Sequence, residues 1–165
     1  MNSFTISQKF KYLFSLPVIV AALGYFVDIY DLTLFGIVRV ESLKALGSDT
    51  EKVGSLILNW QMFGLLIGGI LWGVLGDKKG RLTVLFGSIL VYSLANIACG
   101  FMPQLTFMDQ TTLYCILRFV AGVGLAGELG AGITLVSESL PKELRAIGTS
   151  LVAGFGLLGA VVAKL

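Results

Sequence analysis

The sequence predicts an all-α protein, a polytopic bundle of helices that crosses a membrane. Hydrophobic residues make up 56% of its 165 residues and the mean hydropathy is +0.89, values well outside the range of soluble globular domains. Apolar runs recur along the chain, each long enough for the roughly 20 residues that a bilayer crossing requires. Basic residues gather in alternate connections between these runs, which is typical of integral membrane proteins.

The predicted spans follow one another with short connections. They cover about residues 13–40, 53–75, 82–102 and 112–137, and a fifth run opens near residue 146 and continues to residue 165. The first run is too long for the apolar core of a cleavable signal peptide, so we expect it to remain as a helix. Because the fifth run continues to the last residue without a polar tail, we expect the chain to be cut within a longer polypeptide.

The basic residues predict how the spans are oriented. On one side of the membrane they precede the first span, fill the connection after the second and follow the fourth: Lys9, Lys11, Lys78, Lys79, Arg81, Lys142 and Arg145. On the other side, Arg39, Lys44 and Lys52 are offset by neighbouring acids. This asymmetry predicts a cytoplasmic N-terminus and a location in the inner or plasma membrane of the cell. Since topology explains the bases, the formal net charge of +2 indicates no nucleic-acid partner.

The residue types give little support to enzyme chemistry. Histidine is absent from the sequence, which removes the commonest metal ligand and the usual proton shuttle near neutral pH. Cys99 and Cys115 both fall within predicted spans, where we interpret them as small apolar side chains. The sequence offers no cluster with metal-ligand spacing and no nucleophile with a base. We therefore expect neither an enzyme nor a bound metal or cofactor.

Ionisable residues inside the predicted spans are the candidates for substrate binding and proton coupling. A charge in the hydrocarbon costs about 2.5 to 3.5 kcal/mol by insertion scales, so it normally faces a partner or a water-filled cavity. Asp28 and Asp31 project toward about the same helix face, where paired carboxylates tend to retain a proton. Arg118 lies near one end of the fourth span, and Glu128 follows about three turns later. Two alternatives stay open, namely Asp28 near the membrane surface and Glu128 as a structural tie to a neighbouring helix.

Glycines within the spans predict closely packed helices. The spacings Gly64-x-x-x-Gly68 and Gly69-x-x-x-Gly73 each place two glycines on a shared face, which allows helix backbones to approach in lipid. Tight packing and an interface that slides are both compatible with this pattern.

Four segments of the chain resemble the Major Facilitator Superfamily of transporters. Residues 73–81 (GVLGDKKGR) resemble its pattern G-x-x-x-D-[RK]-x-G-R, which lies between the second and third helices. Residues 118–128 (RFVAGVGLAGE) are similar to the fourth-helix pattern R-x-x-x-G-x-G-x-G-G-E of proton-coupled members. Residues 138–145 (ESLPKELR) resemble the segment E-x-x-P-x-x-x-R of sugar porters and metabolite:proton symporters. Residues 28–31 (DIYD) resemble the first-helix D-x-[YF]-D of metabolite and phosphate symporters.

Two positions depart from these patterns. Ala126 replaces the first glycine of G-G-E, which loosens the assignment to a subfamily. Ala146 stands where sugar porters usually have glycine, which favours the symporters over true sugar porters.

The resemblance implies a twelve-helix transporter built from two six-helix halves, with its binding site near the bilayer midplane between them. Residues 1–165 are then an incomplete N-terminal six-helix domain with about five helices present, and the C-terminal half is expected in the same polypeptide. The resemblance also implies that Asp31 is the proton-titrating acid and that Arg118 is its charge partner. Glu138 is then a gate acid on the cytoplasmic side, paired with Arg145 or with the 73–81 loop.

The same resemblance implies a cytoplasmic gating network whose contacts break and re-form as the halves rock: Gly73, Asp77, Lys78, Gly80, Arg81, Glu138 and Arg145. We therefore predict proton-coupled symport of a small polar metabolite, an organic anion or phosphate, with the proton gradient as driving force. The expected partners are this solute and the membrane lipids. One alternative is a uniporter or symporter of sugars or other solutes in the same superfamily. An alternative from another class is a membrane scaffold or assembly subunit that transports nothing.

Overall fold

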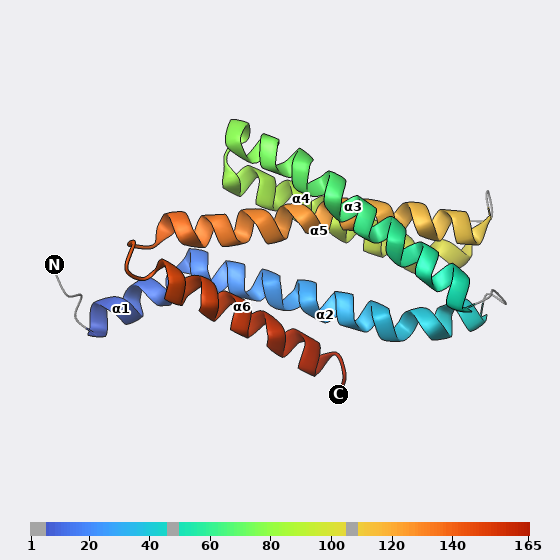
Figure 1. Cartoon of the computed structure of the whole chain (residues 1–165), viewed down its shortest axis with the longest axis horizontal. Coiled ribbons are helices and arrows are strands. Elements are labelled where there is room, and N and C mark those ends of the chain that lie inside the picture. The colour runs from blue at the N-terminus through green and yellow to red at the C-terminus, as the bar shows by residue number, and fades with distance from the viewer. Residues whose placement is uncertain (1–5, 46–49, 105–108) are drawn as a thin grey trace. The chain divides into compact units, whose positions relative to one another are not determined.

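The computed structural model describes residues 6–45, 50–104 and 109–165. Figure 1 shows its elements, which are helices joined by short connections: α1 (Ile6–Leu13), α2 (Leu16–Ala45), α3 (Thr50–Lys79), α4 (Arg81–Gly100), the 3-10 helix η1 (Met102–Gln104), α5 (Gln110–Ser139) and α6 (Arg145–Val162). The predicted all-α fold is confirmed for the described residues.

Five helices in the described parts of the chain are long and apolar enough to cross a membrane. Their spans are Leu16–Glu41, Lys52–Lys79, Arg81–Gly100, Gln110–Ser139 and Arg145–Val162. Each corresponds to one of the apolar runs predicted from the sequence. Many large apolar side chains on these helices are exposed, as expected of a surface that faces lipid rather than water.

The first predicted span starts too early, because the helix is interrupted before Leu16. α1 ends at Leu13 and α2 begins at Leu16, where the Val18 amide donates to the Ser15 carbonyl oxygen at 3.0 Å. Pro17 stands in the first turn of α2, where its missing N–H costs no helical hydrogen bond. Hydropathy alone does not reveal this break, because the residues around it are mostly apolar.

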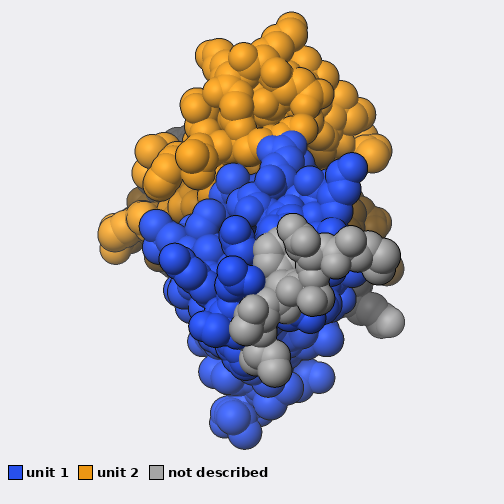
Figure 2. Space-filling view, turned by 90° about the vertical axis from the view of Figure 1, so that its left-hand side faces the viewer, with its two compact units in different colours: residues 1–34, 132–165 blue, residues 35–131 orange. Residues whose placement is uncertain are grey.

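The chain divides into two compact units (Figure 2), and each has a core of its own. Unit 1, blue in Figure 2, comprises residues 1–34 and 132–165. Its core is formed by small and medium apolar side chains from α2, α5 and α6: Val18, Ala21, Ala22, Val136, Leu140 and Val152. A Cβ atom at Gly159 would overlap the Phe26 carbonyl oxygen, so α6 and α2 meet there at backbone contact.

Unit 2, orange in Figure 2, comprises residues 35–131 and holds the end of α2, all of α3 and α4, and most of α5. Its core cluster contains two aromatic rings among aliphatic and sulfur-containing side chains: Phe35, Leu43, Ile57, Met102, Leu113, Tyr114 and Cys115. Within this unit α3 packs against α4 and also against α5.

Glycines allow α3 and α5 to approach at backbone contact. A Cβ atom at Gly64 would overlap the Phe119 carbonyl oxygen, and one at Gly68 would lie 2.5 Å from the Val123 carbonyl oxygen. The close packing predicted for Gly64-x-x-x-Gly68 is therefore present in unit 2.

The second glycine pair behaves differently. A Cβ atom at Gly69 or Gly73 would meet no described atom within 4 Å, and both residues are exposed. These two glycines lie on a face of α3 that the described part of unit 2 leaves open.

Trp72 ties α3 to α5 by a hydrogen bond. Its indole Nε1 donates to the Val123 carbonyl oxygen at 2.7 Å. Gly127 makes room for the ring, since a Cβ atom there would lie 2.7 Å from the indole Cδ1. The glycines of the fourth predicted span therefore accommodate a large side chain as well as a neighbouring backbone.

Candidate functional site

The two acids of α2 lie well inside its apolar span. Asp28 is fully buried at 0% exposure and falls near the middle of the Leu16–Glu41 span, whereas Asp31 is partly buried. This position does not favour the alternative that Asp28 lies near the membrane surface. Both residues belong to unit 1, one helical turn apart on the same helix.

Arg118 is a buried cation held against aromatic rings. Its side chain, on α5 in unit 2, is 7% exposed, and its Cζ lies 3.7 Å from the centroid of the Phe35 ring. The Tyr114 centroid is 5.7 Å from the same carbon. The faces of aromatic rings attract a cation, and the attraction grows when water is excluded. The sequence thus supplies a fixed positive charge inside the unit 2 core.

Glu128 occupies a different level of α5 from Arg118. It is partly buried and lies ~15 Å further along the helix. That separation makes it a poor direct partner for the Arg118 guanidinium, so its assignment as a structural tie or a coupling residue stays a prediction.

The two acids of α2, Asp28 and Asp31, belong to unit 1. Arg118 and Glu128 of α5 belong to unit 2. The pairing of Asp31 with Arg118 that the resemblance implies therefore stays a prediction.

The 73–81 segment contains an ion pair and a sharp connection between α3 and α4. Arg81 Nη2 lies 2.9 Å from Asp77 Oδ1, and a Cβ atom at Gly76 would lie 2.8 Å from Arg81 Nη1. Gly80 has φ 89° and ψ 151°, a backbone conformation that glycine adopts without steric cost. Two other members of the predicted network, Gly73 and Lys78, are exposed.

The 138–145 segment connects α5 to α6. Glu138 is exposed near the end of α5, and Arg145 Nε donates to the Leu140 carbonyl oxygen at 3.1 Å. Arg145 therefore satisfies a carbonyl of the connecting turn. Its predicted pairing with Glu138 and the gate function of both residues stay predictions.

Sequence reasoning missed Gln61, because it weighed charged residues within the spans and passed over a neutral amide. Gln61 is fully buried in α3. A Cβ atom at Gly122 of α5 would overlap the backbone carbonyl oxygen of Gln61. The signal was available in the spacing, since Gln61 precedes the Gly64-x-x-x-Gly68 pair by one helical turn and so shares its face.

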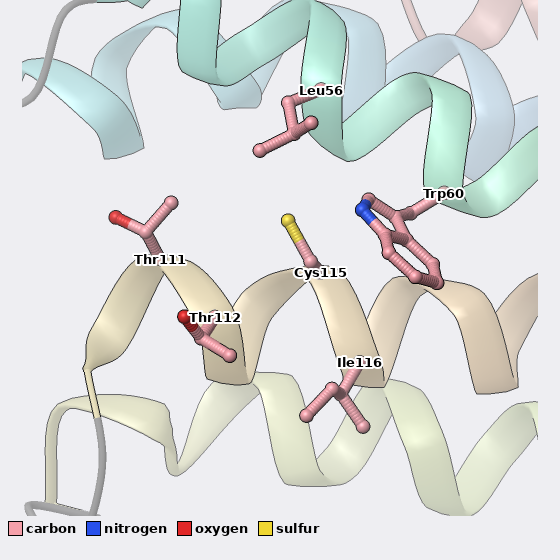
Figure 3. Close-up of a pocket in the computed structure, with 6 residues that line it drawn as sticks. All are labelled: Leu56, Trp60, Thr111, Thr112, Cys115 and Ile116. Atoms are coloured by element: carbon pink, nitrogen blue, oxygen red, sulfur yellow. The ribbon is translucent and has the colours of Figure 1, made fainter.

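A groove with a volume of about 390 Å³ lies between α3 and α5 (Figure 3). Its walls are apolar except for two threonines: Leu56, Trp60, Thr111, Thr112, Cys115 and Ile116. Figure 3 shows the Cys115 sulfur directed from α5 toward α3. None of the predicted coupling residues lines this groove among the described residues, so it does not fit a polar solute. Across residues 6–45, 50–104 and 109–165, no group of three His, Cys, Asp or Glu could hold a metal ion.

Apolar spans that carry a buried acid and a buried arginine define this chain as a polytopic integral membrane protein. The family model of the Major Facilitator Superfamily matches residues 21–164, and the chain belongs to that superfamily.

Named relatives agree with this membership. The chain is 34% identical over 146 residues to the niacin transporter NiaP of Acinetobacter baylyi, covering 88% of this chain and 32% of the relative. It is 30% identical over 154 residues to the benzoate transport protein of the same organism, covering 90% and 32%. It is 28% identical over 178 residues to the low affinity inorganic phosphate transporter 3 of Petunia hybrida, covering 100% and 33%. The chain thus spans about a third of the length of these relatives. No solved structure matches it.

Proposed function

We propose that the protein is a secondary active transporter that symports a small organic anion or phosphate together with protons. The observation that carries this proposal is the Arg118 guanidinium, a cation buried in an apolar span and seated on Phe35. Ionisable residues inside membrane spans are rare and commonly mark the path of a substrate or an ion. The names of the relatives support an anion, because niacin and benzoate are aromatic carboxylates and phosphate is an inorganic anion.

Proton coupling follows from linkage between two charges. In this proposal Arg118 and the Asp31 carboxylate attract each other when no solute is bound. An anion that binds Arg118 weakens this attraction, which favours proton uptake by Asp31. Because linkage is reciprocal, protonation of Asp31 also strengthens anion binding at Arg118. The proton gradient can then drive accumulation of the solute.

A second part of the proposal concerns the charges of the 73–81 and 138–145 segments. The Asp77–Arg81 ion pair lies at the surface, with the Asp77 side chain 71% exposed and that of Arg81 29% exposed, and surface pairs are worth ~1 kcal/mol or less. A contact this weak can break and re-form during a conformational cycle. We place each of these two segments on the cytoplasmic side, as the distribution of basic residues favours, and the protein in the inner or plasma membrane.

The test is uptake by proteoliposomes that contain the protein as the cell makes it. Radiolabelled benzoate, niacin and inorganic phosphate are offered singly, with and without an imposed pH gradient. The proposal predicts that at least one of these anions accumulates above its external concentration, and that a protonophore abolishes the accumulation. An uptake rate that is the same with and without the pH gradient would contradict proton coupling and favour a uniporter.

A further inference from the structure

Gln61 is a buried amide that the rest of the described structure does not satisfy. Its side chain is 0% exposed, and neither Nε2 nor Oε1 has a hydrogen-bond partner among the described residues. An amide without a partner in an apolar interior carries a large free-energy cost relative to an apolar side chain of the same size. A binding partner that arrives from outside the bundle would remove that cost.

Gln61 lies on the face of α3 that packs against α5. Gly64 and Gly68 follow it by one and two helical turns and meet the backbone of α5. A Cβ atom at Gly122 would overlap the Gln61 carbonyl oxygen, so the two backbones touch at this level. Gly122 comes one turn after Arg118 on α5. Gln61 and Arg118 therefore stand on facing sides of one helix pair within unit 2.

Helix geometry leads us to expect that the side chains of these two residues extend in the same direction. α3 and α5 run parallel here, because successive turns of α3 meet successive turns of α5. Side chains on a helix tilt toward its N-terminus. One turn toward the N-terminus, Ile57 precedes Gln61 on α3, and Tyr114 precedes Arg118 on α5. Ile57 and Tyr114 belong to the same buried cluster. We therefore expect the amide and the guanidinium to border the same end of that cluster.

We propose that Gln61 is a substrate-binding residue whose Nε2 donates a hydrogen bond to an oxygen of the carboxylate or phosphate that Arg118 attracts. This inference rests on the proposed function and adds a second ligand to it. A carboxamide suits the task because its two N–H donors bind an anionic oxygen without adding a charge. Arg118 supplies the attraction, while Gln61 fixes the orientation of the oxygens.

The experiment measures counterflow exchange of benzoate and of inorganic phosphate in proteoliposomes with the protein as the cell makes it. Gln61→Met keeps the length of the side chain and removes its hydrogen-bonding groups, and Gln61→Glu places a negative charge beside the anion. Asn59→Leu is the matched control, because Asn59 is an exposed polar residue of the same helix.

We expect Gln61→Met to raise KM for the transported anion about tenfold or more while the maximal rate changes less than about twofold. Gln61→Glu should raise KM further, and Asn59→Leu should keep the wild-type constants. An unchanged KM in Gln61→Met overturns the inference, and so does a lowered maximal rate at unchanged KM, which would assign Gln61 to the motion instead.

Two further measurements separate failure of this inference from failure of the proposed function. Should Gln61→Met fail to fold, Gln61→Asn shortens the side chain by one methylene and carries the same test, with an increased KM expected. A wild-type protein that exchanges neither anion overturns the proposed function itself, and that result needs no variant to be recognised.

Discussion

The Arg118 guanidinium carbon lies 3.7 Å from the centre of the Phe35 ring, a contact that joins α5 to the end of α2 within unit 2. Tyr114 completes the arrangement, because its ring meets Phe35 edge to face, with 6.1 Å between centroids and 85° between planes. The two rings stabilise the cation by their quadrupoles and contribute no negative charge of their own. These contacts hold the guanidinium inside unit 2.

The first prediction concerns this contact. Phe35→Leu removes the ring face beneath Arg118 and leaves a small cavity, so it should lower the free energy of unfolding in detergent by roughly 2–3 kcal/mol. Phe35→Tyr keeps the ring and should cost much less. Phe86→Leu is the control, because Phe86 is 70% exposed on α4. Equal losses in Phe35→Leu and Phe86→Leu would show that the cation–ring contact adds nothing.

The second prediction separates the two glycine pairs of α3. Gly64→Ala should lower the melting temperature, because its Cβ atom would overlap the Phe119 carbonyl oxygen. Gly69→Ala should leave the melting temperature unchanged or slightly higher, since alanine favours a helix by ~1 kcal/mol over glycine and no described atom lies within 4 Å. Thermal unfolding followed by circular dichroism compares them. A destabilised Gly69→Ala would reveal a neighbour at that face.

The third prediction concerns the connection between α3 and α4. Gly80→Ala forces a side chain into a backbone conformation with φ 89°, at a cost of about 1–3 kcal/mol in the free energy of unfolding. Gly73→Ala, seven positions earlier in an open helical position, serves as its control. Urea or SDS unfolding measures both variants. Identical unfolding midpoints for Gly80→Ala and Gly73→Ala would contradict the positive φ of Gly80.

Much of the fold was predictable because bilayer thickness constrains sequence directly. Length and hydropathy sufficed to locate the five spans found among the described residues, and the same argument placed Asp28 and Arg118 inside them. The interruption before Leu16 was missed, because it depends on local backbone geometry among residues that are mostly apolar.

Tertiary contacts decided what the sequence left open. Gly64-x-x-x-Gly68 and Gly69-x-x-x-Gly73 have identical spacing, yet only the first pair meets α5 among the described residues. The burial of Gln61 could not be predicted for a related reason. A neutral amide contributes little to hydropathy, and its burial depends on which face of α3 is covered.

Uphill uptake by Asp31→Asn tests proton coupling most directly. The variant is compared with Glu41→Gln, which alters an exposed acid of the same helix that is paired with Lys44 at 3.0 Å. In proteoliposomes with an imposed pH gradient, our account predicts that Asp31→Asn no longer accumulates the anion but keeps part of its counterflow exchange, while Glu41→Gln accumulates it normally. Undiminished accumulation by Asp31→Asn would contradict the account.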